Sequence, residues 1–81
     1  MPEVFRQNGF RAFFYSNEGK PREPPHVHVT RDGAIAKLWL RPFVTVADSR
    51  GFDARALRTI CGMVIQRREE IESAWNEYFG D

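Results

Sequence analysis

Two dipeptides that favour tight turns, Asn8-Gly9 and Asp32-Gly33, constrain the fold of this chain more than any other feature. Each dipeptide separates two segments rich in apolar and aromatic residues, and each tolerates the positive φ angles that a two-residue hairpin turn requires. The sequence therefore predicts two antiparallel hairpins. Their four strands are expected at residues 3–7, 10–16, 26–31 and 34–41.

The segment between the hairpins, NEGKPREPP, is rich in glycine and proline and is predicted to be a loop. Pro24-Pro25 at its end favours an extended backbone where the third strand begins. After the second hairpin, residues 42–50 contain the apolar segment VTVA, and a turn is predicted at residues 48–51. This segment is compatible with a fifth strand.

The last third of the chain is predicted to be helical. Asp53 is a suitable N-cap, and apolar residues recur at spacings of three and four from Leu57 to Tyr78. A single helix of about 25 residues would be roughly 38 Å long, more than so small a sheet covers. Either the helix bends between Gly62 and Arg68, or its end packs on another chain. The second alternative is favoured by three large aromatic residues, Trp75, Tyr78 and Phe79.

These elements define the expected fold class. The chain is predicted to be a single α+β domain over residues 1–81, with a small antiparallel sheet of two hairpins covered on one face by a long or bent C-terminal helix. A length of 81 residues, 42% hydrophobic residues and a net charge of +1 favour one folded core. No apolar run is long enough to span a membrane, and Cys61 is the only cysteine, so we expect a cytoplasmic protein.

Strand alternation predicts which side chains share a face of the sheet. One face, expected to contact the helix, carries Val27, Val29, Ala36 and Leu38. The opposite face of the second hairpin carries His26, His28, Thr30, Lys37 and Trp39. The first hairpin adds Arg6, Arg11, Phe13 and Tyr15 to that face if both hairpins join one sheet. The histidines are therefore expected to point away from the core.

The spacing of His26 and His28 allows three interpretations. Their side chains project the same way about 6 to 7 Å apart, so one metal ion or one phosphate group could contact both. With Glu18 they would form a catalytic metal site of two histidines and one carboxylate. Without a metal, either histidine could act as general acid or base beside a bound anion or RNA. In the third interpretation the pair only stacks on Trp39 and hydrogen-bonds to loop backbone.

Five segments occur in an unusual order, FRAFFYSNE, PPHVHV, AKLWL, RGFDARAL and AWNEYF. In this order they resemble a family of small bacterial proteins of unknown function, over nearly the whole chain. The resemblance implies that the protein pairs with another small protein from a neighbouring gene, in a toxin–antitoxin-like module. Helices of that family tend to open with a capping box, whereas this chain keeps the cap in Asp53 and lacks the reciprocal glutamate.

The side chains and the resemblance lead to one functional hypothesis and two alternatives. We expect one component of a toxin–antitoxin-like pair that binds or acts on RNA, with His26 and His28 as candidate catalytic residues. The residues expected to bind RNA are Arg6, Arg11, Tyr15 and Lys37. The alternatives are a small metal-dependent enzyme that uses His26, His28 and Glu18, and a protein-interaction module without catalysis. A homodimer is also expected, and no membrane partner.

Overall fold

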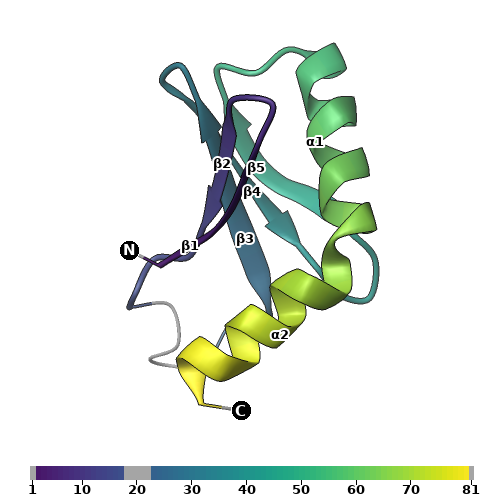
Figure 1. Cartoon of the computed structure of the whole chain (residues 1–81). Helices are drawn as coiled ribbons and strands as arrows, with labels where there is room; N and C mark the ends of the chain where they lie inside the picture. The colour runs from purple at the N-terminus through teal and green to yellow at the C-terminus, as the bar shows by residue number, and fades with distance from the viewer. Residues whose placement is uncertain (1, 18–22, 81) are drawn as a thin grey trace.

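The protein folds into a five-stranded antiparallel sheet and two helices (Figure 1). It is described here by a computed structural model of residues 2–17 and 23–80. The strands are β1 (Glu3–Gln7), β2 (Phe10–Phe13), β3 (His26–Arg31), β4 (Ala34–Trp39) and β5 (Thr45–Arg50). The helices are α1 (Ala54–Gln66) and α2 (Arg68–Phe79), and neither is long and apolar enough to cross a membrane. The expected α+β class is confirmed.

Both predicted hairpins are present. Asn8 and Asp32 have φ angles of 54° and 51°, and the glycines that follow them have φ angles of 81° and 85°, as these two-residue turns require. The register of β3 with β4 is the predicted one, so that His28 lies opposite Lys37. The sheet order is β1-β2-β3-β4-β5, and each strand therefore pairs only with its neighbours in sequence.

Two strands are shorter than predicted. β2 ends at Phe13 rather than at residue 16, and β4 ends at Trp39 rather than at residue 41. Backbone pairing continues irregularly beyond both ends. The Phe14 amide donates to the Pro2 carbonyl at 3.0 Å, and the Leu40 amide donates at 3.2 Å to the loop that precedes β3.

The segment after β4 does form a fifth strand. β5 is the last strand of the sheet, and all six of its residues are exposed. Its register shifts opposite Lys37 and Leu38, where a β-bulge or similar irregularity interrupts the pairing. In the regular part of the pairing, which includes the first residues of β4, Asp48 lies opposite Lys37 and Arg50 lies opposite Ile35.

The C-terminal segment forms two helices, not the single helix of about 25 residues that the apolar periodicity predicts. Arg67 separates them, with backbone angles of φ −105° and ψ 16°. Its guanidinium lies 4.2 Å from the ring centre of Phe5 and donates to Gln7 at 2.9 Å. These contacts hold the junction against β1, and α2 leaves α1 at a sharp angle (Figure 1).

The N-terminal end of α1 is capped as predicted. The Asp53 carboxylate accepts a hydrogen bond from the Ala56 amide at 2.8 Å. Phe52, the residue before the cap, is partly buried against the core, with its ring 6.0 Å from that of Phe10. The cap therefore defines the start of α1 although the glutamate of a capping box is missing.

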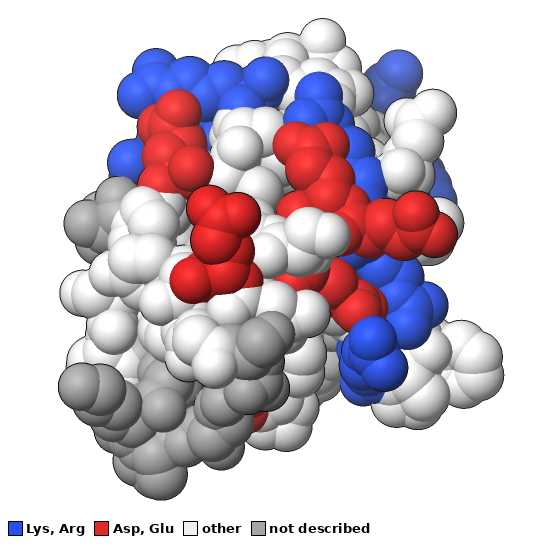
Figure 2. All heavy atoms as spheres, turned by 60° about the horizontal axis from the view of Figure 1, so that its bottom comes forward, with Lys and Arg blue, Asp and Glu red and all other residues white. Residues whose placement is uncertain are grey.

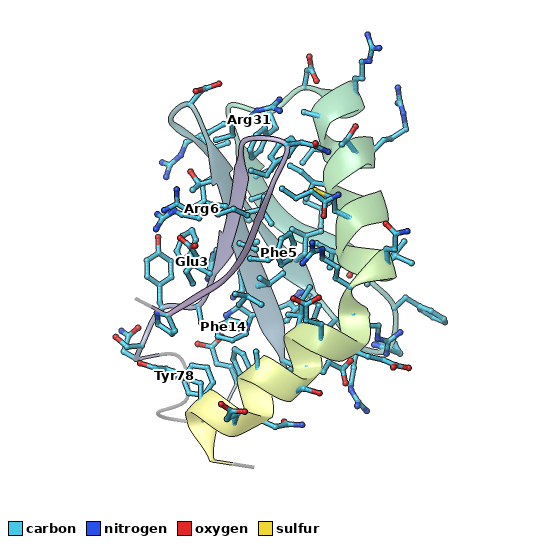
Figure 3. All side chains as sticks on the ribbon, viewed as in Figure 1. Glu3, Phe5, Arg6, Phe14, Arg31 and Tyr78 are labelled. Atoms are coloured by element: carbon cyan, nitrogen blue, oxygen red, sulfur yellow. The ribbon has the colours of Figure 1, made fainter. Side chains whose placement is uncertain are left out.

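Both helices share one hydrophobic cluster with the sheet. The helix residues in it are Ile60, Met63, Val64, Ile71 and Trp75. The sheet contributes Phe5, Phe10, Ala12, Val27, Val29, Ala36 and Leu38, with Phe14 and Leu40 just beyond strand ends. Figure 3 shows Phe5 directed toward the helices and Glu3 and Arg6 directed to the opposite side of β1.

Trp75 corrects the expectation that the C-terminal aromatic residues pack on another chain. Its side chain is 1% exposed, and its ring lies 5.3 Å from Phe14 and 4.3 Å from Phe79. The break at Arg67 returns this end of the chain to its own sheet, so the bend is the right alternative for Trp75. Tyr78 remains 46% exposed.

The acidic side chains of α2 gather at the end of the molecule that this helix forms (Figure 2). Among them Glu72 is the one that joins α2 to the loop after β4. Its carboxylate accepts hydrogen bonds from Arg41 Nε and Arg68 Nε, both at 3.0 Å. Partial burial alone would raise the pKa of Glu72, but the hydrogen bonds and charges of the two arginines outweigh burial and hold the pKa below its ordinary value.

Replacing Glu72 by glutamine should lower the unfolding free energy at neutral pH by about 1 kcal/mol, since water screens the pair with Arg41, which is largely exposed, and Arg68 is only partly buried. The folded-state pKa is depressed, so this stabilisation is complete above the unfolded pKa near 4.5 and disappears as the pH falls through the folded value. The unfolding free energies of wild type and Glu72→Gln, measured by urea unfolding, should differ at neutral pH and should be equal in strong acid. Glu70→Gln, which breaks only an exposed pair with Arg67, serves as the control. An equal difference at both pH values would contradict this assignment.

Candidate nucleic-acid interface

The sheet face opposite the hydrophobic cluster carries rows of side chains that cross several strands. We call it the outer sheet face. Its first row, taken from the paired positions of adjacent strands, is Arg6, Arg11, Thr30, Ile35 and Arg50. The second row is Phe13, His28, Lys37 and Asp48. The third row is His26, Trp39 and Thr45.

Two of the predicted cations on this face are held by carboxylates. Arg6 Nε donates to Glu3 at 2.9 Å, and both side chains lie on the same side of β1 (Figure 3). Lys37 Nζ lies 3.6 Å from a Glu23 carboxylate oxygen and 4.4 Å from the ring centre of Trp39. Solvent-accessible ion pairs of this kind are weak, so a phosphate group could replace either carboxylate.

Two other arginines of the first row have no carboxylate partner among the residues that the structure describes. Within residues 2–17 and 23–80, neither Arg11 nor Arg50 makes an ion pair. The Arg11 guanidinium lies 4.8 Å from the ring centre of Phe13, and Arg50 is exposed at the end of β5. Adjacent strands are about 4.8 Å apart, so the three strand steps between these two residues correspond to roughly 14 Å.

A pocket of about 200 Å³ opens on this face. Its walls include Tyr15, His28, Lys37, Asp48, Ser49 and Arg50. The structure thus brings together three residues predicted from the sequence and three from β5 that the prediction missed. β5 could not be aligned with β4 from the sequence, because the irregularity in its pairing breaks simple alternation.

His26 is fully buried, which corrects the prediction that it points into solvent. Its ring lies between those of Trp39 and Trp75, at centroid distances of 5.4 and 5.0 Å. Its Nδ1 is 2.9 Å from the Pro24 carbonyl and carries the proton of that hydrogen bond, since a carbonyl only accepts. For His26, the predicted bond to loop backbone is present, but the ring meets Trp39 edge to face, at an interplanar angle of 78°, and does not stack on it. Strand alternation could not show that α2 brings Trp75 to this histidine.

His28 is also largely buried, at 7% exposed, so the prediction of an open position is wrong for it too. Its ring stacks on Phe13 at 5.6 Å and meets Tyr15 edge to face at 4.5 Å. Unlike His26, however, it borders the 200 Å³ pocket. Of the two candidate catalytic residues, His28 is therefore the one placed beside a ligand space.

The metal interpretation finds two of its three ligands close together. The ring centres of His26 and His28 are 5.3 Å apart. Glu18, the carboxylate of the predicted set, lies outside the described residues. Within the part of the chain that the structure describes, no group of three histidine, cysteine, aspartate or glutamate side chains could hold a metal ion. The metal site of His26, His28 and Glu18 stays a prediction.

A larger pocket, of about 430 Å³, lies at the start of α1. It includes Asn8, Arg31, Asp53 and Arg55 among its walls. Arg31 is already engaged, since its guanidinium lies 3.9 Å from the ring centre of Phe10 and donates to the Asn8 carbonyl at 3.4 Å. None of the residues predicted to bind RNA lines this pocket, so we place the candidate site on the outer sheet face.

The fold and this face define a small α+β protein with an antiparallel five-stranded meander and a surface of cations and aromatic rings. The sequence model of the family described as Domain of unknown function (DUF4160) matches residues 9–76, and the chain belongs to that family. This match confirms the predicted resemblance to a small family of unknown function. No similarity to a curated protein or to a solved structure is found.

Proposed function

We propose that this protein binds RNA through the outer sheet face, as one component of a bacterial toxin–antitoxin-like pair. One observation carries the RNA proposal: Arg11 and Arg50 have no carboxylate partner among the described residues, and they share a face with a pocket bordered by aromatic and basic side chains. Cations beside ring surfaces suit the phosphates and bases of single-stranded RNA. The paired-gene context rests on the resemblance alone.

The positions of the cations suggest how the RNA backbone would run. A strand of RNA that crosses the sheet along the first row would meet Arg11 above β2 and Arg50 above β5. Lys37, one row away, borders the pocket and could exchange its contact with Glu23 for a phosphate. Such contacts neutralise phosphates without reading the sequence, so binding should be strongly dependent on salt.

The pocket supplies the second element of the proposed site. Its small volume fits a single group, either one base or one phosphate. Tyr15 is half-buried and offers the ring against which a base would stack. His28, between Tyr15 and Lys37 on the pocket wall, is the residue we assign as general acid or base if the bound RNA is cleaved. His26 then has a structural role, because both tryptophans enclose it.

Removing Arg11 or Arg50 should weaken RNA binding in a manner that depends on salt. For a fluorescent single-stranded RNA, Arg11→Gln and Arg50→Gln should each lower the slope of log affinity against log salt by about 0.7, the value for one phosphate contact on a single strand. The measurement is fluorescence anisotropy at several salt concentrations. Double-stranded RNA of the same sequence should bind less well, because its bases cannot enter the pocket.

Arg55→Gln provides the matched control for this titration. Arg55 is an exposed arginine that likewise makes no ion pair within the described ranges, but it lies on α1, away from the outer sheet face. Its loss should leave the slope unchanged. If Arg55→Gln lowers the slope as much as Arg50→Gln, or if wild type fails to bind RNA at low salt, the proposed face is wrong.

A further inference from the structure

Asp48 places a carboxylate on the wall of the 200 Å³ pocket, beside the cations of the outer sheet face. It lies on β5, directly opposite Lys37 on β4. Of the described residues on the pocket walls, Asp48 is the acidic one. A carboxylate repels a phosphate group, so this wall of the pocket suits the other part of a nucleotide, the base.

The carboxylate of Asp48 is accessible to a ligand. Its side chain is exposed, and over the two stretches of chain that the structure describes it makes no ion pair. Lys37, its neighbour across the strands, instead has its Nζ 3.6 Å from Glu23. The oxygens of Asp48 can therefore accept hydrogen bonds from a group that enters the pocket.

The position of the pocket across three strands fits a planar base. His28 on β3 and Asp48 on β5 are two strand steps apart, which corresponds to roughly 10 Å. Tyr15, whose ring centre is 4.5 Å from that of His28, borders the pocket on the His28 side. A base that stacks on Tyr15 can therefore present its hydrogen-bonding edge to Asp48.

Guanine has the edge that best complements this wall. A carboxylate only accepts hydrogen bonds, and it binds most strongly to two parallel N–H donors. Guanine presents such a pair, N1–H beside the N2 amino group, followed by the acceptor O6. Adenine and cytosine present one amino group beside an acceptor nitrogen, and uracil presents one N–H between two carbonyl groups. The Lys37 ammonium, which has three donors, suits the guanine O6.

We propose that this pocket binds guanine, and that Asp48 is the residue that selects guanine from the other bases of single-stranded RNA. The Asp48 carboxylate accepts from N1–H and N2–H, Tyr15 stacks on the base, and Lys37 donates to O6. Arg11 and Arg50 keep the phosphate contacts. The proposal rests on the proposed RNA binding and goes beyond it, because phosphate contacts carry no sequence information.

Fluorescent single-stranded RNAs that differ at one position test the base selection. In a short oligomer of uridines, a central guanosine should raise the affinity about tenfold over adenosine, cytidine or uridine at the same position and salt concentration. Inosine, which keeps N1–H and O6 but lacks the amino group, should give an intermediate affinity. Equal affinities for all five RNAs would overturn this proposal and leave RNA binding intact. Failure of every RNA to bind at low salt would overturn both.

Asp48→Asn tests the residue assignment, because an amide cannot accept from both guanine donors. The variant should lose the preference for guanosine, with affinity for the guanosine RNA lower by about tenfold and affinity for the all-uridine RNA not reduced. Asp32→Asn is the matched control. Asp32 is exposed in the turn between β3 and β4, outside this pocket, and asparagine tolerates its φ angle of 51°. Circular dichroism should show both variants folded. A preference that survives in Asp48→Asn, or disappears equally in Asp32→Asn, would show that Asp48 does not select the base.

Discussion

Replacing Trp75 by alanine should lower the unfolding free energy by about 3–5 kcal/mol, the usual cost of removing a large buried aromatic side chain. Trp75 is 1% exposed and its ring contacts Phe14, Phe79 and His26, so its removal opens a cavity where α2 meets the sheet. A domain of this size has a total stability of roughly 4–12 kcal/mol, and the variant should be partly or fully unfolded at room temperature. Urea unfolding followed by circular dichroism gives the loss directly.

Tyr78→Ala is the matched control, because Tyr78 is an aromatic residue of the same helix that is 46% exposed. Its replacement should cost less than about 1 kcal/mol. The pair distinguishes packing within one chain from an interface at this end of α2. If Trp75→Ala stays folded and loses only self-association, the interface expected from the sequence would be right after all.

His26→Ala should be the second most destabilising change, with a loss of about 2–4 kcal/mol in unfolding free energy. The variant loses the packing between Trp39 and Trp75 and the hydrogen bond from Nδ1 to the Pro24 carbonyl. These are the two tryptophans of the chain, so intrinsic fluorescence reports on the same contacts during denaturation. His26→Phe keeps a ring in this position and should recover part of the loss.

His28→Ala makes the same chemical change one row away, at the wall of the pocket. We expect it to cost less stability than His26→Ala, because His28 contacts Phe13 and Tyr15 and lies at the edge of a cavity. RNA binding at a temperature where both variants are folded should be reduced by His28→Ala more than by His26→Ala. The reverse order would show that the structural and functional assignments of the histidines are exchanged.

The sheet was predictable because its determinants are local. Asn8-Gly9 and Asp32-Gly33 specify both turns, and a two-residue turn fixes the register of the strands that it joins. The register then places His28 opposite Lys37, so two members of the candidate site followed from counting along the chain. The N-cap at Asp53 was predictable for the same reason, since the carboxylate bonds to a backbone amide three residues away.

The predictions that were wrong concern features that depend on contacts between residues far apart in the sequence. The helix break at Arg67 coincides with contacts to Phe5 and Gln7, which no periodicity within residues 54–79 can reveal. The same break returns α2 to the sheet and encloses His26 beside Trp75, so the error in the helix produced the error in the exposure of that histidine. Arg50 was missed because the irregular pairing of β5 had to be known before its partner could be counted.

The contact of Arg67 with Gln7, 60 residues apart, has a consequence for the nascent chain. During synthesis the first hairpin leaves the ribosome long before α2 exists, and every strand pair can form early because each joins neighbours in sequence. Phe14, however, gains its partner Trp75 only after α2 has been synthesised. A chain that stops short of α2 would hold a formed sheet with an open apolar face, the kind of species that aggregates or is degraded. The sheet can therefore cover its apolar face only after α2 has been synthesised.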